Sequence, residues 1–370
     1  MEPAARRRRR GALVALLCLA VGAFAFGASL GDGQAPPPGL ASTLSLKQLA
    51  GERIVVGLDG TSISPGLRAA IHEGRIAGVV LFAGNFPTRA AGRRLIARLQ
   101  AIPRPSKLRP PLLVMVDQEG GEVKRLSGAP TASAREMGAR GAAFSAEQGR
   151  RTAANLRDVG VNVDLAPVLD VARPGGVIAE TERSFGATAD RVAATAIPFA
   201  RALQAGGVAA TGKHFPGFGA ARENTDFSVE RIPLSKHELR AVDEKPYRAF
   251  VAAGARLVML STAIYPAFSQ DPAAFTRSIA TGELRNRLGF EGVTISDALE
   301  TPAVEHFGSP AQAAVAGARA GTDLLLYVRL GSALSGWKAL VAKLRSGALD
   351  REEFEQAAER VLGLRAEAAR

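Results

Sequence analysis

The feature that most constrains the fold is a regular alternation of short apolar runs with longer helical segments. Continuous apolar runs of this kind are typical of strands that are buried on both faces of a parallel sheet. Eight such runs occur, at 54–60 (IVVGLDG), 77–83 (AGVVLFA), 111–117 (PLLVMVD), 162–170 (NVDLAPVLD), 208–216 (VAATGKHFP), 257–266 (LVMLSTAIYP), 292–297 (GVTISD) and 322–328 (TDLLLYV).

The segments between these runs have helical periodicity. Within one of them, Leu239, Val242 and Phe250 recur near a period of 3.6 residues. Ser235 and Glu238 predict a capping box at its start. The predicted helices include 89–101, 146–159, 191–205, 236–253 and 331–345. Eight alternations of strand and helix predict a single-domain α/β fold, a (β/α)8 TIM-type barrel over residues 45–370, with a doubly wound sheet as the alternative.

The amino terminus has the pattern of an export signal. Residues 6–10 are all arginine, and residues 11–30 (GALVALLCLAVGAFAFGASL) carry no charge. This pattern predicts a signal peptide or an N-terminal membrane anchor over residues 1–31, with the arginines on the cytoplasmic side. Residues 32–44 then predict a Pro-rich linker. We therefore expect an extracytoplasmic domain, either secreted or anchored to the outer face of the cytoplasmic membrane, with membrane contact only through this segment.

Composition excludes several classes of function. The chain has one cysteine, which excludes a disulfide framework, a Cys-rich zinc site and an iron–sulfur cluster. The formal net charge is +12, but no run of like charge follows residue 10, so we expect no nucleic-acid partner. The four histidines are scattered, and neither a P-loop nor a GxSxG motif is present. We therefore expect no metal and no cofactor, while the oligomeric state stays open.

Polar side chains gather at the carboxyl ends of the predicted strands. Asp117 ends the third run, and Asp164 and Asp170 lie in and at the end of the fourth. Lys213 and His214 lie in the fifth, and Asp297 ends the seventh. In a barrel these ends form one face, where side chains from different strands converge. Paired carboxylates without a metal-ligand cluster are typical of polar-bond hydrolysis, and of glycoside cleavage in particular. The residues alone predict a barrel hydrolase that acts on sugars.

A set of motifs in one order makes this prediction more specific. They are VVGLDGT (55–61), GVVLFAGN (78–85), VDQEGG (116–121), NVDLAPVLDV (162–171), ERSFG (182–186), GKHFPGFG (212–219) and LGFEGVTISDALE (288–300). Over residues 45–365 the chain resembles glycoside hydrolase family 3, specifically its single-domain β-N-acetylhexosaminidase branch. The resemblance implies a retaining β-glycosidase that releases N-acetylglucosamine from peptidoglycan fragments or related glycosides, with a small carbohydrate as its partner.

The resemblance also implies roles for individual residues. Asp297 matches the catalytic nucleophile, which attacks the anomeric carbon and must be ionised. Asp117, Arg183, Lys213 and His214 match residues that hold the sugar hydroxyls and shape the subsite. Such charged groups suit a polyhydroxylated ligand because each hydroxyl can both donate and accept a hydrogen bond.

The loop after the KHFPG motif departs from the family pattern. The branch carries an Asp-Ser-His triplet there, and its histidine is the acid/base. In this chain the triplet falls on Asn224-Thr225-Asp226, so the histidine is replaced by Asp226. Other positions that differ from the family pattern are Phe218, Thr262 and Glu122.

Three interpretations of this departure stay open. In the first, Asp226, or Glu223 in the same loop, takes over as the catalytic acid/base beside Asp297. In the second, leaving groups are activated enough for the nucleophile to suffice, and the enzyme is slow or transfers the sugar. In the third, the domain is an impaired pseudoenzyme that binds sugars or peptidoglycan without turnover. A proton donor is worth about 10²–10⁴-fold in rate, so the choice matters.

Overall fold

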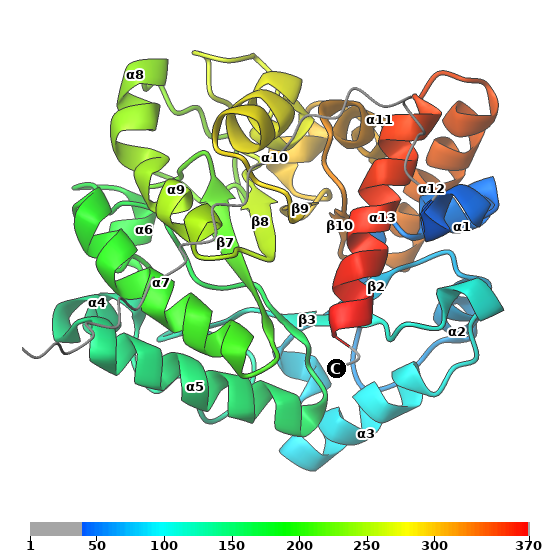
Figure 1. Ribbon diagram of the computed structural model, residues 1–370, viewed down its shortest axis with the longest axis horizontal. Helices are drawn as coiled ribbons and strands as arrows, with labels where there is room; N and C mark the ends of the chain where they lie inside the picture. Colours follow the sequence, from blue (N-terminus) through cyan, green and yellow to red (C-terminus); the bar gives the residue numbers. More distant parts are fainter. Residues whose placement is uncertain (1–38, 369–370) are drawn as a thin grey trace, which may run out of the picture. The chain divides into compact units, whose positions relative to one another are not determined.

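The computed structural model describes residues 39–368, which fold around a barrel of parallel strands (Figure 1). The strands are β1 Ile54–Gly57, β2 Gly78–Leu81, β3 Leu113–Val116, β6 Val163–Asp164, β7 Ala209–Phe215, β8 Leu257–Leu260, β9 Val293–Ser296 and β10 Leu325–Tyr327. They form one sheet in the order β10-β1-β2-β3-β6-β7-β8-β9. A parallel bridge between Ile295 on β9 and Leu324, just before β10, joins the two ends of this order and closes the barrel. A separate antiparallel hairpin consists of β4 Gln118–Gly120 and β5 Val123–Lys124.

The barrel confirms the predicted strands, because each of the eight apolar runs contains one strand of the sheet. Closure of the sheet excludes the doubly wound alternative. The α-helices are α1 Leu46–Gly51, α2 Pro65–His72, α3 Arg89–Gln100, α4 Ala134–Arg140, α5 Ala142–Val159, α6 Val177–Glu180, α7 Ala189–Ala205, α8 Lys236–Glu238, α9 Lys245–Ala252, α10 Pro302–Glu305, α11 Pro310–Ala320, α12 Leu330–Arg345 and α13 Arg351–Glu367. Short 3-10 helices are η1 Leu40–Thr43, η2 Ala83–Asn85, η3 Ser106–Leu108 and η5 Ala273–Phe275, and π-helices are η4 Leu239–Asp243 and η6 Ser278–Arg287.

The helices surround the strands and begin at capping residues (Figure 1). Thr88, Thr188 and Ser309 accept backbone N–H groups at the starts of α3, α7 and α11. Each such cap satisfies an N–H group that the first turn of the helix leaves without a partner. The helical bounds follow the predicted segments closely, since α3, α5, α7 and α12 lie where the periodicity placed them.

The predicted helix over residues 236–253 is divided. Its capping box is present, since the side chains of Ser235 and Glu238 each accept the other's backbone N–H. The segment then runs through η4 before α9 begins. Pro246, near the start of α9, has no N–H group to continue an α-helical ladder. The N–H of Glu244 instead donates to the carbonyl oxygen of Leu239, five residues earlier, at 2.8 Å.

Residues 40–44, which fall within the predicted linker, pack against the domain. Ala41 and Leu44 are buried, and the N–H of Ala41 donates to the carboxylate of Glu359 on α13 at 2.7 Å. This end of the predicted linker is therefore part of the fold. The predicted signal peptide or anchor, with the rest of the linker, lies outside the described residues. Within residues 39–368, no helix combines the length and the apolar character needed to cross a membrane.

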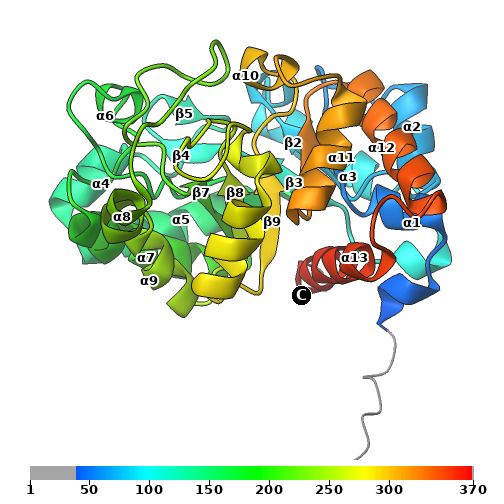
Figure 2. The ribbon, with the colours of Figure 1, turned by 90° about the horizontal axis from the view of Figure 1, so that it is seen from above.

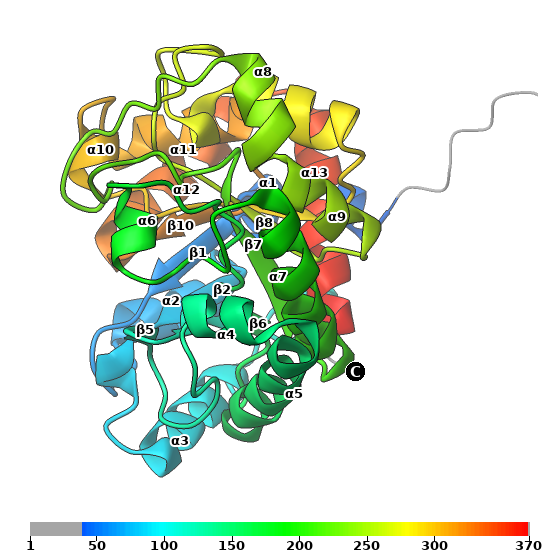
Figure 3. The ribbon, with the colours of Figure 1, turned by 90° about the vertical axis from the view of Figure 1, so that its left-hand side faces the viewer.

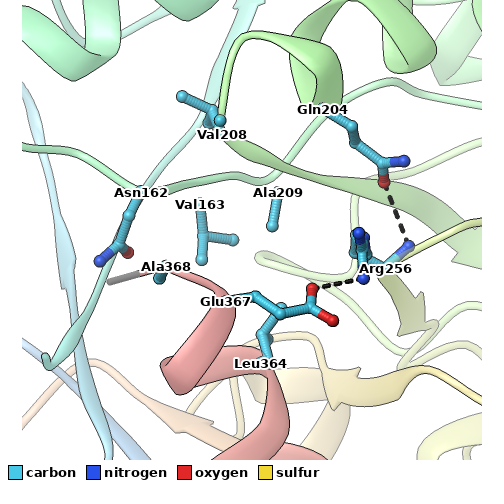
Figure 4. A pocket seen from close by; sticks show the side chains of 10 residues that line it. Asn162, Val163, Gln204, Val208, Ala209, Arg256, Leu364, Glu367 and Ala368 are labelled. Atoms are coloured by element: carbon cyan, nitrogen blue, oxygen red, sulfur yellow. Dashed lines mark hydrogen bonds and ion pairs between the residues drawn. The ribbon is translucent and has the colours of Figure 1, made fainter. Parts of the chain in front are cut away.

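Helix α13 closes the amino-terminal end of the barrel. Val361 and Leu364 pack against the apolar side chains of the barrel interior, among them Val163. Figure 4 shows the end of α13 beneath the starts of β6 and β7, where Glu367 forms an ion pair with Arg256. The opposite end, where the strands finish, carries the cavity that is lined by the residues predicted for the site.

A buried arginine fixes α13, and its loss should destabilise the fold strongly. Arg365 is 1 % exposed, forms an ion pair with the buried Glu52, and donates to the carbonyl oxygens of Pro110 at 2.6 Å and Pro111 at 3.0 Å. Arg365→Met leaves a buried carboxylate uncompensated, so we expect the free energy of unfolding to fall by about 3–5 kcal/mol in urea denaturation.

Two controls test the reason for this loss. Arg351→Met removes an exposed ion pair with Glu355 on the same helix and should change stability by less than about 1 kcal/mol. The double variant Glu52→Gln/Arg365→Met removes the orphaned charge and should recover part of the loss. Equal stability of the single and double variants would contradict the explanation.

Candidate active site

A cavity of about 430 Å³ opens where the strands end. The loop between β7 and α8 lies beside α10 at this end of the barrel (Figures 2 and 3). All six residues expected at the site line this one cavity, although they come from five separate segments: they are Asp117, Arg183, Lys213, His214, Asp226 and Asp297. Their convergence is what closure of the barrel produces, because the carboxyl ends of its strands meet at one face.

One wall of the cavity is a chain of ion pairs in which cations and carboxylates alternate. Lys213, on β7, donates to Asp117 at 2.7 Å and contacts the Glu119 carboxylate at 2.7 Å. Arg183, in the loop after α6, makes two hydrogen bonds to the same Glu119 carboxylate at 2.8 and 2.9 Å. Arg125 extends the chain to Asp117 at 3.4 Å. Three cations and two carboxylates thus hold one another in fixed positions, with Lys213 in the middle, between Asp117 and Glu119.

The pKa values of these groups follow from their partners. Burial alone would raise the pKa of Glu119, but Arg183 and Lys213 hold it well below its usual range. Burial also opposes the charge of Asp117, whose pKa is nevertheless lowered by Lys213 and Arg125. Burial alone would lower the pKa of Lys213, but the two carboxylates raise it. The wall therefore stays ionised near neutral pH and offers charged hydrogen-bonding groups to a polar ligand.

A buried aspartate orients His214. Asp170 accepts hydrogen bonds from the backbone N–H groups of His214 at 3.1 Å and Phe218 at 2.7 Å. Its other oxygen lies 2.7 Å from Nδ1 of the His214 ring. The Phe218 ring packs against the imidazole with ring centroids 5.6 Å apart. These contacts fix the ring plane and leave Nε2 as the imidazole nitrogen available on the cavity side.

Asp297 follows β9 and has the environment of a perturbed carboxylate. The N–H of Ala298 donates to its Oδ1 at 2.8 Å. Burial raises the pKa of Asp297, and the charge of Asp226 raises it further, whereas His214, the Ala298 N–H and Lys213 act in the opposite direction. The net shift is upward. The charge of Asp226 thus acts on Asp297 across the cavity.

The rewritten loop presents Asp226 to the cavity. Thr225 is buried and anchors the loop, while Asn224 and Asp226 line the cavity on either side of it. The Asn224 amide donates to Oδ2 of Asp226 at 3.0 Å, and the Asp226 N–H donates back to Asn224 Oδ1 at 3.0 Å. Asn224 therefore orients a carboxylate at the triplet position. Glu223 is exposed and does not line the cavity.

The structure adds two residues that sequence reasoning missed, Glu119 and Arg125, and it shows that Asp170, at the end of the fourth apolar run, orients His214. The first two lie in and just after the VDQEGG motif, which was the available signal. Glu122 stands at the position where the family pattern has arginine, and it is exposed outside this cavity. The guanidinium group of Arg125 lines the cavity instead. Thr262 is buried.

Glu119 should act as a positioning residue for the cations on either side of it. Glu119→Gln keeps the size of the side chain but removes the charge that holds Lys213 and Arg183. We expect kcat/KM for a glycoside substrate to fall about 10- to 100-fold, mainly through KM. The matched control is Glu122→Gln in the same hairpin, which should be neutral. A normal KM for Glu119→Gln, in protein whose circular dichroism is unchanged, would contradict this role.

A closed barrel with charged residues gathered at the carboxyl ends of its strands belongs to the class of (β/α)8-barrel enzymes. Residues 45–364 match the glycosyl hydrolase family 3 N-terminal domain. The chain belongs to this family.

Relatives and solved structures agree with this assignment. The chain is 36 % identical to an uncharacterized secreted glycosyl hydrolase of Arthroderma benhamiae, over 88 % of this chain and 94 % of that protein. It is 33 % identical to a β-hexosaminidase of Xylella fastidiosa, over 82 % of this chain and 98 % of that protein.

Two solved structures share the fold. A family 3 β-N-acetylglucosaminidase from Paenibacillus has a TM-score of 0.84 at 34 % identity over 88 % of this chain, which spans 63 % of the Paenibacillus chain. A β-N-acetylhexosaminidase from Beutenbergia cavernae has a TM-score of 0.77 at 32 % identity, over 87 % of this chain and 98 % of that one.

Proposed function

We propose that the protein is a retaining β-N-acetylhexosaminidase that releases terminal N-acetylglucosamine from peptidoglycan-type or related glycosides. Its membership of family 3 and the names of its relatives support this activity. The observation that carries the proposal is the single cavity in which Asp297 and Asp226 stand with the ionised wall formed around Lys213.

The proposed reaction has two steps, each using both carboxylates. Asp297 attacks the anomeric carbon while the bond to the leaving oxygen breaks, and Asp226 gives its proton to that oxygen. Water then attacks the glycosyl–Asp297 ester and loses a proton to Asp226, which restores both groups and the β configuration. Asp117, Arg183, Lys213 and His214 are assigned to the sugar hydroxyls, because charged hydrogen bonds are stronger than neutral ones and fix ligand orientation.

We also place the enzyme outside the cytoplasm. The basic and apolar segments at residues 6–30 support export, and the Arthroderma relative is named a secreted protein. A cell-envelope glycoside is the substrate class that such a location makes available.

The test is release of p-nitrophenol from its β-N-acetylglucosaminide and its β-glucoside by the full chain. We expect the acetamido substrate to be preferred. Preference for the glucoside would keep a glycosidase but reject the substrate. No release from either substrate, with measurable sugar binding by folded protein, would favour the pseudoenzyme interpretation instead.

A further inference from the structure

Two exposed apolar side chains are on the loop that carries Asp226, and a third lines the cavity. Among residues 39–368, four large apolar side chains are exposed: Leu40 at 38 %, Phe227 at 78 %, Val229 at 39 % and Val328 at 37 %. Phe227 and Val229 are on the loop that carries Asp226, and Val328 lines the cavity just beyond β10. Phe227 is the most exposed of the four, and it directly follows Asp226 in the chain.

The local backbone holds Phe227 outside the cavity. The N–H groups of Phe227 and Ser228 donate to the carbonyl oxygen of Asn224 at 2.9 and 3.2 Å, which forms a tight turn. Thr225 points into the fold and is buried, while Asp226 lines the cavity. The next residue therefore lies at the rim, with its Cα about 3.8 Å from that of Asp226.

We propose that Phe227 is the platform for the leaving-group sugar, packing against one face of its ring. This inference rests on the proposed function, because Asp226 must then stand beside the oxygen that joins the two sugars. A group attached to that oxygen would extend out of the cavity alongside Phe227, which follows Asp226. One face of a pyranose ring carries C–H groups, and covering them with an aromatic ring removes apolar surface from water on both partners.

The size of the surface favours a single sugar ring over a macromolecule. Phe227, Val229 and Val328 are the exposed apolar side chains at this end of the described chain, far short of the roughly 800 Å² per partner that stable protein interfaces bury. Phe227 is therefore a specificity-determining residue, which favours a leaving group with a ring over one without.

The experiment compares two substrates that share the N-acetylglucosamine unit. In N,N′-diacetylchitobiose the leaving group is a sugar ring, and in methyl β-N-acetylglucosaminide it has none. We expect Phe227→Ala to lower kcat/KM for the disaccharide about fivefold relative to kcat/KM for the methyl glycoside. Phe227→Trp should restore the preference for the disaccharide. Leu40→Ala, which removes an exposed apolar side chain from η1, should leave the ratio unchanged. An unchanged ratio for Phe227→Ala would overturn the proposal.

A binding measurement separates this proposal from the proposed function. If the protein hydrolyses neither substrate, calorimetry with the Asp297→Asn variant compares the affinities of the disaccharide and of free N-acetylglucosamine. A platform predicts that adding Phe227→Ala weakens disaccharide binding about fivefold relative to the monosaccharide. An equal effect on both ligands, or no effect on either, would reject it whether or not the protein turns over.

Discussion

Replacing Asp297 with asparagine should lower glycoside hydrolysis by on the order of 10⁴-fold or more, because the amide cannot form the covalent intermediate. Asparagine has nearly the same size, and the Ala298 N–H can still donate to its side-chain oxygen, so the fold should be unchanged. The measurement is kcat/KM for p-nitrophenyl β-N-acetylglucosaminide.

The matched control for this prediction is Asp190→Asn on the surface of α7, where the exposed carboxylate pairs with Lys245 and does not line the cavity. This variant should retain normal activity. Substantial turnover by Asp297→Asn would show that another group is the nucleophile, since a residual rate cannot come from the amide.

Replacing Asp226 with asparagine should produce an effect that depends on the leaving group. For a poor leaving group such as an alkoxide, loss of the proton donor should lower kcat/KM by about 10²–10⁴-fold. For 2,4-dinitrophenolate, which departs without protonation, the first step should be nearly normal. The second step still lacks its base, so a glycosyl adduct on Asp297 should accumulate and be visible by mass spectrometry of acid-quenched protein.

The control here is Glu223→Gln in the same loop, which should be neutral because Glu223 is exposed away from the cavity. If Glu223→Gln shows the dependence on leaving group and Asp226→Asn does not, the acid is Glu223. A uniform loss for Asp226→Asn across all leaving groups would indicate a role in binding alone.

The same variant should shift the pH dependence. Asp297 must be ionised to attack, and its pKa is raised by burial and by the charge of Asp226. Asp226→Asn removes that charge, so the pKa of Asp297 should fall and the acid limb of kcat/KM for the dinitrophenyl substrate should move to lower pH. An acid limb that stays in place or moves upward would contradict the coupling of the two carboxylates.

The sequence predicted the barrel because its signal is local. A short apolar run predicts each strand, and periodicity with a capping residue predicts each long helix. Neither signal depends on distant residues. The division of the predicted helix over residues 236–253 was missed, because helix propensity does not show how the backbone hydrogen bonds change ahead of Pro246. The packing of residues 40–44 could not be predicted, because Ala41 is held by Glu359, 318 residues away.

The site was predicted in part for the same reason. Strand-end position and motif resemblance suggested Asp117, Lys213 and Asp297, and all three line one cavity. The connections between the residues could not be read from the chain. Glu119 holds Arg183 across 64 residues, and Asp170 holds His214 across 44. A buried carboxylate that serves two cations has no signature in sequence until the strands are placed side by side.

The measurement that tests the central claim most directly is the configuration of the first product. Proton NMR can follow p-nitrophenyl β-N-acetylglucosaminide with the full chain before the released sugar mutarotates. A covalent intermediate on Asp297 inverts the anomeric carbon twice, so the account predicts that β-N-acetylglucosamine forms first and the α anomer grows in later. Initial release of the α anomer would contradict the account, because it requires a single displacement by water with no glycosyl–Asp297 intermediate.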